Sequence, residues 1–230
     1  MRFNFRTSGL QGRGIATGLA LLLTFCVGSP QLAAAERDQT VLVVGDSLSA
    51  GHGITQEESW VALLGERLRS EGYGYAVANA SVTGDTTTGG LKRLPRALKV
   101  HQPAIVIIEL GGNDGLRGTP ITVMRSNMAQ MIELSQAAGA RVILAGMQIP
   151  TNYGGPYTKA FADLYPELAR QYRTELVGFF LDGIALDRTL FQADGIHPTA
   201  KAQRILVDNV WPPLEKAMRR KNLSAETARQ

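Results

Sequence analysis

The segment Val41-Leu42-Val43-Val44-Gly45-Asp46-Ser47-Leu48 places a serine directly after a short apolar run. A β-branched, apolar run of this length predicts a strand buried on both faces, as in a parallel sheet covered by helices. In an open parallel sheet, functional residues lie at the carboxyl ends of the strands. Ser47 therefore stands where such a sheet carries its chemistry.

Outward from this run, strand-like and helix-like segments alternate along the chain. Short apolar runs predict further strands at residues 77–80, 105–110, 142–145 and 176–181. Helical periodicity occupies residues 60–68, 91–100, 124–138, 161–172 and 205–218. The alternation predicts one α/β domain, a three-layer α/β/α sandwich around a mostly parallel five-stranded sheet with right-handed crossovers.

The N-terminus has the pattern of a targeting segment. Arg2, Arg6 and Arg13 precede and border an apolar stretch at residues 15–27, and the small-residue site Ala33-Ala34-Ala35 follows. This pattern predicts a cleaved signal peptide at 1–35 and a single mature domain at 36–230, located in the periplasm or secreted. The alternative is a membrane anchor, but the apolar stretch is shorter than the roughly 20 residues that a spanning helix needs.

Charge and cysteine usage limit the partners of the mature domain. The whole chain has a net charge of +4, and losing the three arginines of the leader, which has no acidic residue, lowers it to +1. We therefore expect no nucleic-acid partner. Cys26, the single cysteine, leaves with the leader, so the mature domain has no disulfide. We expect residues 221–230, which are polar, to form a frayed tail.

A second segment, Asp194-Gly195-Ile196-His197-Pro198, supplies the partners that a nucleophilic serine requires. A serine hydroxyl is a weak nucleophile until an imidazole takes its proton, and a carboxylate must hold that imidazole in one tautomer. Ser47, His197 and Asp194 form a candidate set. We expect His52, in a glycine-rich loop, and His101, before a strand, to be surface residues.

Other site motifs are absent from the sequence around Ser47. Ser49 stands where a nucleophile elbow has its second glycine. The glycine-rich stretch 45–53 lacks the Gly-Lys-Ser/Thr ending of a phosphate loop. We therefore expect neither an ordinary α/β-hydrolase nor a nucleotide-binding protein.

Four separated blocks resemble those of the SGNH (GDSL) hydrolases in order and spacing. They are Gly45-Asp46-Ser47-Leu48, Gly84, Gly111-Gly112-Asn113-Asp114 and Asp194-Gly195-Ile196-His197-Pro198. The likeness extends from about residue 39 to about residue 215 and is greatest to the family's bacterial esterases and thioesterases. It implies a flavodoxin-like fold and an ester hydrolase that needs no cofactor.

The resemblance also implies a role for each matching residue. Ser47 corresponds to the nucleophile, His197 to the base and later acid, and Asp194 to the residue that orients the imidazole. The oxyanion hole corresponds to the backbone N–H groups of Ser47 and Gly84 and the side-chain amide of Asn113, donors that suit a tetrahedral oxyanion. A glycine at 84 leaves its N–H open to the substrate, although a simple turn is the alternative explanation.

A metal-dependent phosphoesterase is an alternative function. Asp46, Asp114, Asp194 and His197 could supply oxygen and nitrogen ligands. We favour a structural role for Asp46 and Asp114, in which their carboxylates accept backbone hydrogen bonds and brace the loops. We therefore expect no metal site.

The segment 148–157 follows a predicted strand and is poor in helix-forming residues, so it could form one wall of a pocket. The apolar Leu116, Ile149, Pro150 and Tyr153 suit an acyl chain. The implied substrates are lysophospholipids, aryl and acyl esters, and acyl thioesters. A carbohydrate O-deacetylase is the nearest alternative. We expect a monomer that acts on a small ester or lipid and contacts lipid transiently.

Overall fold

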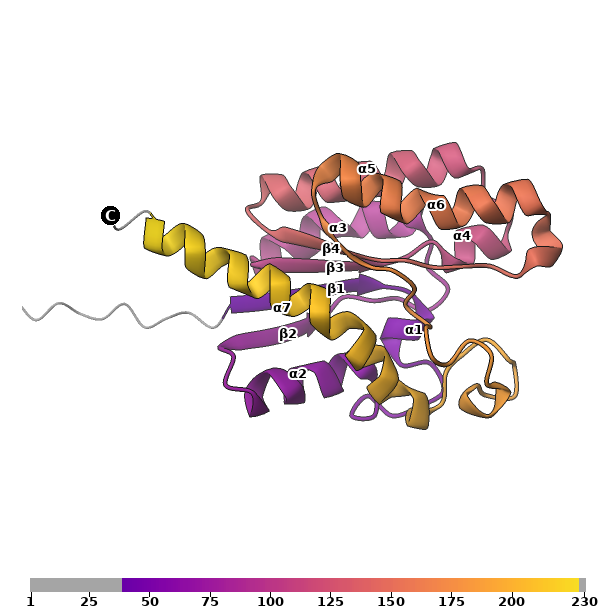
Figure 1. The fold of residues 1–230 in the computed structure, drawn as a ribbon, viewed down its shortest axis with the longest axis horizontal. Coiled ribbons are helices and arrows are strands. Elements are labelled where there is room, and N and C mark those ends of the chain that lie inside the picture. Colours follow the sequence, from indigo (N-terminus) through magenta and orange to yellow (C-terminus); the bar gives the residue numbers. More distant parts are fainter. Residues whose placement is uncertain (1–38, 228–230) are drawn as a thin grey trace, which may run out of the picture. The chain divides into compact units, whose positions relative to one another are not determined.

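The computed structural model describes residues 39–227, with side chains through Arg219, and this part of the chain surrounds a five-stranded sheet (Figure 1). The strands are β1 (Gln39–Gly45), β2 (Tyr75–Asn79), β3 (Ile105–Glu109), β4 (Arg141–Ala145) and β5 (Glu175–Val177). Their order is β2-β1-β3-β4-β5, and all neighbouring pairs are parallel. The predicted five-stranded sheet is confirmed, and its order is that of flavodoxin-like folds.

Helices cover both faces of the sheet, as the sequence predicts. The helices α3, α5 and α6 pack side by side over one face, and α2 and α7 pack together over the other (Figure 1). The helices are α1 (Ser47–Ala50), α2 (Trp60–Ser70), α3 (Thr87–His101), α4 (Gly112–Leu116), α5 (Ile121–Ala137), α6 (Gly155–Tyr172) and α7 (Gln203–Thr227), with 3-10 turns η1 (Thr151–Tyr153), η2 (Arg188–Leu190) and η3 (Ala200–Ala202).

The three central strands are buried on both faces. All five residues of β3 are buried, and so are Val41, Leu42, Val43 and Val44 of β1. Because each face of these strands meets a helical layer, their sequences are continuously apolar instead of alternating. The unbroken apolar runs were therefore a correct signal for parallel strands.

The predicted strand at 176–181 is wrong in its extent, because β5 ends at Val177. Beyond it, the N–H of Phe180 donates to the carbonyl of Gly146 at 2.8 Å, and the chain turns through residues 180–185. The Phe180 ring is fully buried and meets Trp60 edge-on, with ring centroids 5.4 Å apart. The apolar residues of this segment therefore serve core packing instead of extending the strand.

The helix α6 begins at Gly155, earlier than its apolar periodicity predicts. Pro156 lies in its first turn, where a proline is tolerated because the missing N–H has no partner in the helix. The predicted irregular segment 148–157 is therefore partly ordered, since η1 and the first turn of α6 occupy its second half.

The sequence predicts a signal peptide at the N-terminus and a frayed tail at the C-terminus. The predicted signal peptide at 1–35 lies outside the described residues. The backbone of α7 is helical as far as Thr227, and fraying of the segment 221–230 stays a prediction. None of the helices in the described part of the chain has the length and apolar content that crossing a membrane requires.

Glu109, the last residue of β3, places a fully buried carboxyl group beneath the loop that carries Ser47. Its Oε2 accepts a hydrogen bond from Ser49 Oγ at 2.6 Å and another from the N–H of Asp46 at 3.4 Å. A Cβ added to Gly45 would lie only 2.7 Å from this oxygen, so glycine is required for the close approach. Burial, and secondly the charge of Asp46, raise the pKa of Glu109 well above its usual value.

We predict that Glu109→Gln flattens the pH dependence of stability. A carboxyl group whose pKa is higher in the folded than in the unfolded protein stabilises the fold below its unfolded pKa, and this contribution is lost as the pH rises through the folded pKa. Glutamine keeps an acceptor oxygen for Ser49 and cannot ionise. Urea unfolding from about pH 5 to about pH 9 should therefore show a smaller fall in the free energy of unfolding for the variant.

The exposed Glu57 provides the matched control. Glu57→Gln should keep the wild-type pH slope, because it removes a carboxyl group from the surface and leaves the buried Glu109 in place. A Glu109→Gln protein with the slope of the wild type would contradict the prediction.

Candidate active site

The carboxyl ends of β1 and β3 create the crevice in which the predicted residues meet. After β1 the chain crosses to α2 on one face of the sheet, and after β3 it crosses to α5 on the other. Such a switch point leaves a gap between the two departing connections. Ser47 begins α1 immediately after β1, and Asn113 lies in α4 immediately after β3.

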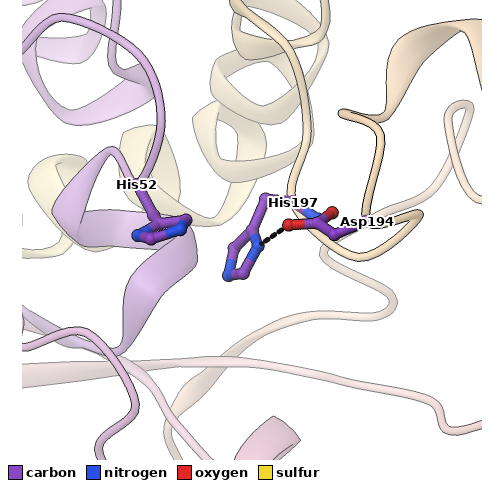
Figure 2. A group of neighbouring side chains, drawn as sticks. All are labelled: His52, Asp194 and His197. Atoms are coloured by element: carbon purple, nitrogen blue, oxygen red, sulfur yellow. Dashed lines mark hydrogen bonds and ion pairs between the residues drawn. The ribbon is translucent and has the colours of Figure 1, made fainter.

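Ser47, His197 and Asp194 form a continuous hydrogen-bonded line. His197 Nε2 lies 2.9 Å from Ser47 Oγ, and His197 Nδ1 lies 2.6 Å from Asp194 Oδ2 (Figure 2 shows the second contact). An ionised carboxylate can only accept, so Nδ1 carries the imidazole proton. The lone pair of Nε2 therefore faces the serine hydroxyl, as removal of its proton requires.

Asp194 also shapes the turn that presents His197. Its Oδ1 accepts the backbone N–H groups of Ile196 at 2.9 Å and of His197 at 3.0 Å. The hydrogen bond from His197, followed by those of the backbone, holds the pKa of Asp194 well below its usual value. The carboxylate is thus ionised throughout the neutral range, although its side chain is 40% exposed.

Asn113 binds the loops on either side of it. Its Nδ2 donates to Asp46 Oδ2 at 3.0 Å and to the carbonyl oxygen of Asp85 at 3.0 Å. Asp46 in turn caps α1 by accepting the N–H of Leu48. Burial raises the pKa of Asp46 to about 6, against the lowering effect of these hydrogen bonds. Because both amide protons of Asn113 have partners, one of these two hydrogen bonds must break before the amide can donate to a substrate oxygen.

Gly84 lies in the turn after β2. Its φ of +77° is in the left-handed region, and the N–H of Asp85 closes the turn on the carbonyl of Val82 at 3.1 Å. A Cβ at this position would meet no atom within 4 Å, so backbone conformation, and not crowding, favours glycine here. The turn explanation raised by the sequence therefore accounts for this glycine by itself.

A cavity of about 1100 Å³ opens beside the serine and the histidine. Its lining includes Ser47, Asn113 and His197 together with the predicted Leu116, Ile149 and Pro150. Tyr153 is not among the lining residues, but its hydroxyl donates to the carbonyl of the lining residue Leu116 at 3.1 Å.

A further part of the cavity lining comes from a segment that the sequence did not indicate as part of the site. It extends from Phe179 to Asp187 and includes Leu181 and the fully exposed Leu186. Phe191 and Ile196 continue it toward His197. The available signal was the apolar, glycine-bounded stretch after residue 177, which we interpreted as a strand.

His52 is exposed, as expected, but it lies beside the predicted site. Its ring centroid is 4.4 Å from that of His197, with the two planes tilted by 45° (Figure 2). His101, at the end of α3, stays a helix-terminal residue. Among the described residues, His52, Asp194 and His197 form a group whose ligand atoms all lie within 4.8 Å of one another.

Asp114 takes the structural role that we favoured. Its two carboxylate oxygens accept the N–H and the hydroxyl of Thr87 at 2.8 and 2.7 Å, which ties α4 to the start of α3. With Asp46 bonded to Leu48 and Asn113, two of the three carboxylates of the alternative metal set, those of Asp46 and Asp114, are occupied in bracing loops.

Comparisons with known proteins agree with this arrangement. Residues 43–205 match the model of the GDSL-like Lipase/Acylhydrolase family. The chain is 50% identical to Esterase TesA of Pseudomonas aeruginosa over 85% of this chain and 98% of that protein. It is 42% identical to Thioesterase 1/protease 1/lysophospholipase L1 of Escherichia coli over 82% of this chain and 85% of that protein.

A solved structure gives the same result in three dimensions. The crystal structure of TesA superposes with a TM-score of 0.76 at 51% identity, covering 78% of this chain and 99% of that one. Sequence and fold thus agree over nearly the whole described domain. The chain belongs to the GDSL-like lipase/acylhydrolase family, the SGNH hydrolases.

Proposed function

We propose that this chain is an exported esterase that cleaves carboxylic esters and thioesters through an acyl-enzyme on Ser47. The observation that carries the proposal is the hydrogen-bonded line from Ser47 through His197 to Asp194, with contacts of 2.9 and 2.6 Å, at the edge of an apolar cavity. The line has the order of nucleophile, base and orienting carboxylate.

In the first half-reaction, Ser47 Oγ attacks the acyl carbon while His197 Nε2 accepts the hydroxyl proton. The imidazolium that results is stabilised by Asp194, whose low pKa keeps it ionised. His197 then gives its proton to the leaving alkoxide or thiolate. In the second half-reaction a water takes the place of the serine hydroxyl, and His197 activates it to release the acid.

The oxyanion of each tetrahedral intermediate needs donors on the side away from His197. We assign this role to the N–H groups of Ser47 and Gly84 and to the amide of Asn113. The present partner of the Asn113 amide, the Asp85 carbonyl at 3.0 Å, is a neutral acceptor. A negatively charged oxygen is a stronger acceptor, so it can displace that carbonyl as the charge develops.

The lining of the cavity favours an acyl chain over a sugar. The apolar side chains of Ile149, Pro150, Leu181 and Phe191 line the same cavity as Ser47. Long-chain acyl esters and lysophospholipids fit this chemistry better than the polar ring of a carbohydrate acetate. The E. coli relative is named as a thioesterase and a lysophospholipase, which supports the same substrate classes.

We further propose that the predicted signal peptide directs the domain to the periplasm or the medium. Acyl-CoA is a cytoplasmic metabolite, so lysophospholipids and external esters are the working substrates after export, and thioester cleavage is incidental. We also propose that the protein is a monomer and that it contacts lipid transiently while it takes up its substrate.

We predict that Ser47→Ala abolishes both hydrolysis and labelling by a fluorophosphonate. The wild type should gain one phosphonyl adduct in intact-protein mass spectrometry and hydrolyse p-nitrophenyl esters, whereas the variant should gain none and lose at least about a thousandfold in kcat/KM. Unlabelled wild type with chelator-sensitive phosphoesterase activity would contradict the serine mechanism.

Asn113→Ala should lose about a hundredfold to a thousandfold in kcat, the usual cost of one oxyanion donor. Because Asn113 also bonds Asp46 and the Asp85 carbonyl, thermal unfolding must be measured alongside the kinetics. A variant that is folded at the assay temperature and still accepts the fluorophosphonate adduct, yet turns over slowly, supports the assignment. A wild-type kcat would remove Asn113 from the hole.

Ile149→Asp should reduce the hydrolysis of palmitoyl esters more than that of acetyl esters, because a charge in the wall opposes a long acyl chain but leaves the serine untouched. Rates with p-nitrophenyl esters from acetyl to palmitoyl measure this ratio. Val100→Asp, at a residue that is 64% exposed outside the cavity lining, is the matched control. An unchanged chain-length profile in Ile149→Asp would contradict the assignment of this wall.

A further inference from the structure

The loop that carries His52 is tied directly to the segment that carries His197. Gln192 donates through Nε2 to the carbonyl of His52 at 2.7 Å and through its own N–H to the carbonyl of His197 at 2.8 Å. Gly51 and Gly53 flank His52 with φ of +73° and +74°, which allows the sharp course of this loop. Gln192 therefore links the backbones of the two histidines.

The resulting group offers a donor set typical of a transition metal. One nitrogen from each of His52 and His197 and one oxygen from Asp194 all lie within 4.8 Å of one another (Figure 2). Two imidazoles and a carboxylate, with a water in the fourth position, are ligands that Zn²⁺ takes in tetrahedral sites. His52 and Asp194 are exposed, so an ion can reach the group from solvent.

We propose that His52, Asp194 and His197 form a regulatory binding site for Zn²⁺, and that its occupation switches hydrolysis off. The inhibitory part of this proposal rests on the proposed function of Ser47 and His197. The binding part depends only on the three side chains.

Zn²⁺ inhibits hydrolysis because it leaves His197 Nε2 unable to accept the serine proton. A neutral imidazole has one N–H, which the hydrogen bond to Asp194 places on Nδ1. When Zn²⁺ coordinates Nδ1, that proton moves through solvent to Nε2, and the total number of protons on the ring is unchanged. Nε2 then donates toward Ser47 Oγ, 2.9 Å away, and can no longer accept the serine proton. When Zn²⁺ coordinates Nε2, the metal takes the lone pair that would accept the serine proton, so either nitrogen as ligand gives inhibition.

The movements that binding requires are small. Ligands at about 2.0–2.2 Å from a tetrahedral Zn²⁺ lie about 3.3–3.6 Å from one another. The contact between His197 Nδ1 and Asp194 Oδ2 must therefore lengthen from 2.6 Å, and the His52 nitrogen already lies within 4.8 Å of its two partners. Both His52 and Asp194 are exposed, so side-chain rotation can supply these shifts.

Zinc binding is tested without hydrolysis in a Ser47→Ala background. Titration calorimetry with ZnCl₂ should show one ion bound per chain, lost in Ser47→Ala/His52→Phe and retained in Ser47→Ala/His101→Phe. Phenylalanine at 52 keeps a ring against His197 and removes the ligand atoms, and His101 is the one other histidine of the chain. Absent binding, or binding that His52→Phe leaves unchanged, would overturn the site.

Inhibition is tested with Ser47 intact. Zn²⁺ should inhibit ester hydrolysis by the wild type reversibly, with recovery on adding a chelator, whereas Mg²⁺, which prefers oxygen ligands, should not. Changes around a metal ligand alone cost 10–100-fold in affinity, so loss of the His52 ligand should raise the half-inhibitory Zn²⁺ concentration at least about tenfold. His101→Phe should keep the wild-type value.

The calorimetric and kinetic assays distinguish the proposed metal site from the proposed serine mechanism. Zinc binding in Ser47→Ala without fluorophosphonate labelling of the wild type would retain the metal site and remove the serine mechanism. Labelling and turnover that are equally zinc-sensitive in His52→Phe and the wild type would remove the metal site and leave the esterase assignment in place.

Discussion

The pairing of β1 with β3 is the constraint on which the site depends. In this register Gly45 stands opposite Glu109, so the two strands end level and the following residues enter the same crevice. Ser47 and Asn113 thereby come from segments far apart in the chain to adjoining loops. A shift by one residue would turn every side chain of β1 to the opposite face of the sheet and would move Gly45 away from Glu109.

The two sides of the crevice differ in their exposure to solvent. Beneath Ser47 lie the buried polar residues Glu109, Ser49 and Asp46, which are joined by hydrogen bonds of 2.6 and 3.4 Å. The pKa values of the Glu109 and Asp46 carboxyl groups are raised. Across from it, His197 stands on a partly exposed turn whose order comes from the Asp194 carboxylate. The buried side presents the hydroxyl, and the solvent-facing side accepts and returns the proton.

The side of the crevice that carries His197 is open to ions as well as to substrate. Substrate and water must reach His197, so the same opening admits ions, and His52 completes a donor set there. In the site that we propose, hydrolysis and metal binding compete for one imidazole. The competition is decided by which nitrogen of His197 carries the proton, so a bound ion acts on the chemistry without filling the acyl cavity.

Local sequence determined most of the fold and the identity of the reactive residues. The apolar run 41–44 predicts a doubly covered strand because burial on both faces leaves no polar alternation, and Ser47, Asp194 and His197 stand in short motifs whose chemistry is local. Tertiary structure alone decided the rest. The end of β5 at Val177, the cavity wall from Phe179 to Leu186, and the approach of His52 to His197 depend on contacts through space, such as Phe180 against Trp60 and Gln192 bridging two loops. No periodicity within a single segment encodes such contacts, because each partner's environment is supplied by a distant part of the chain.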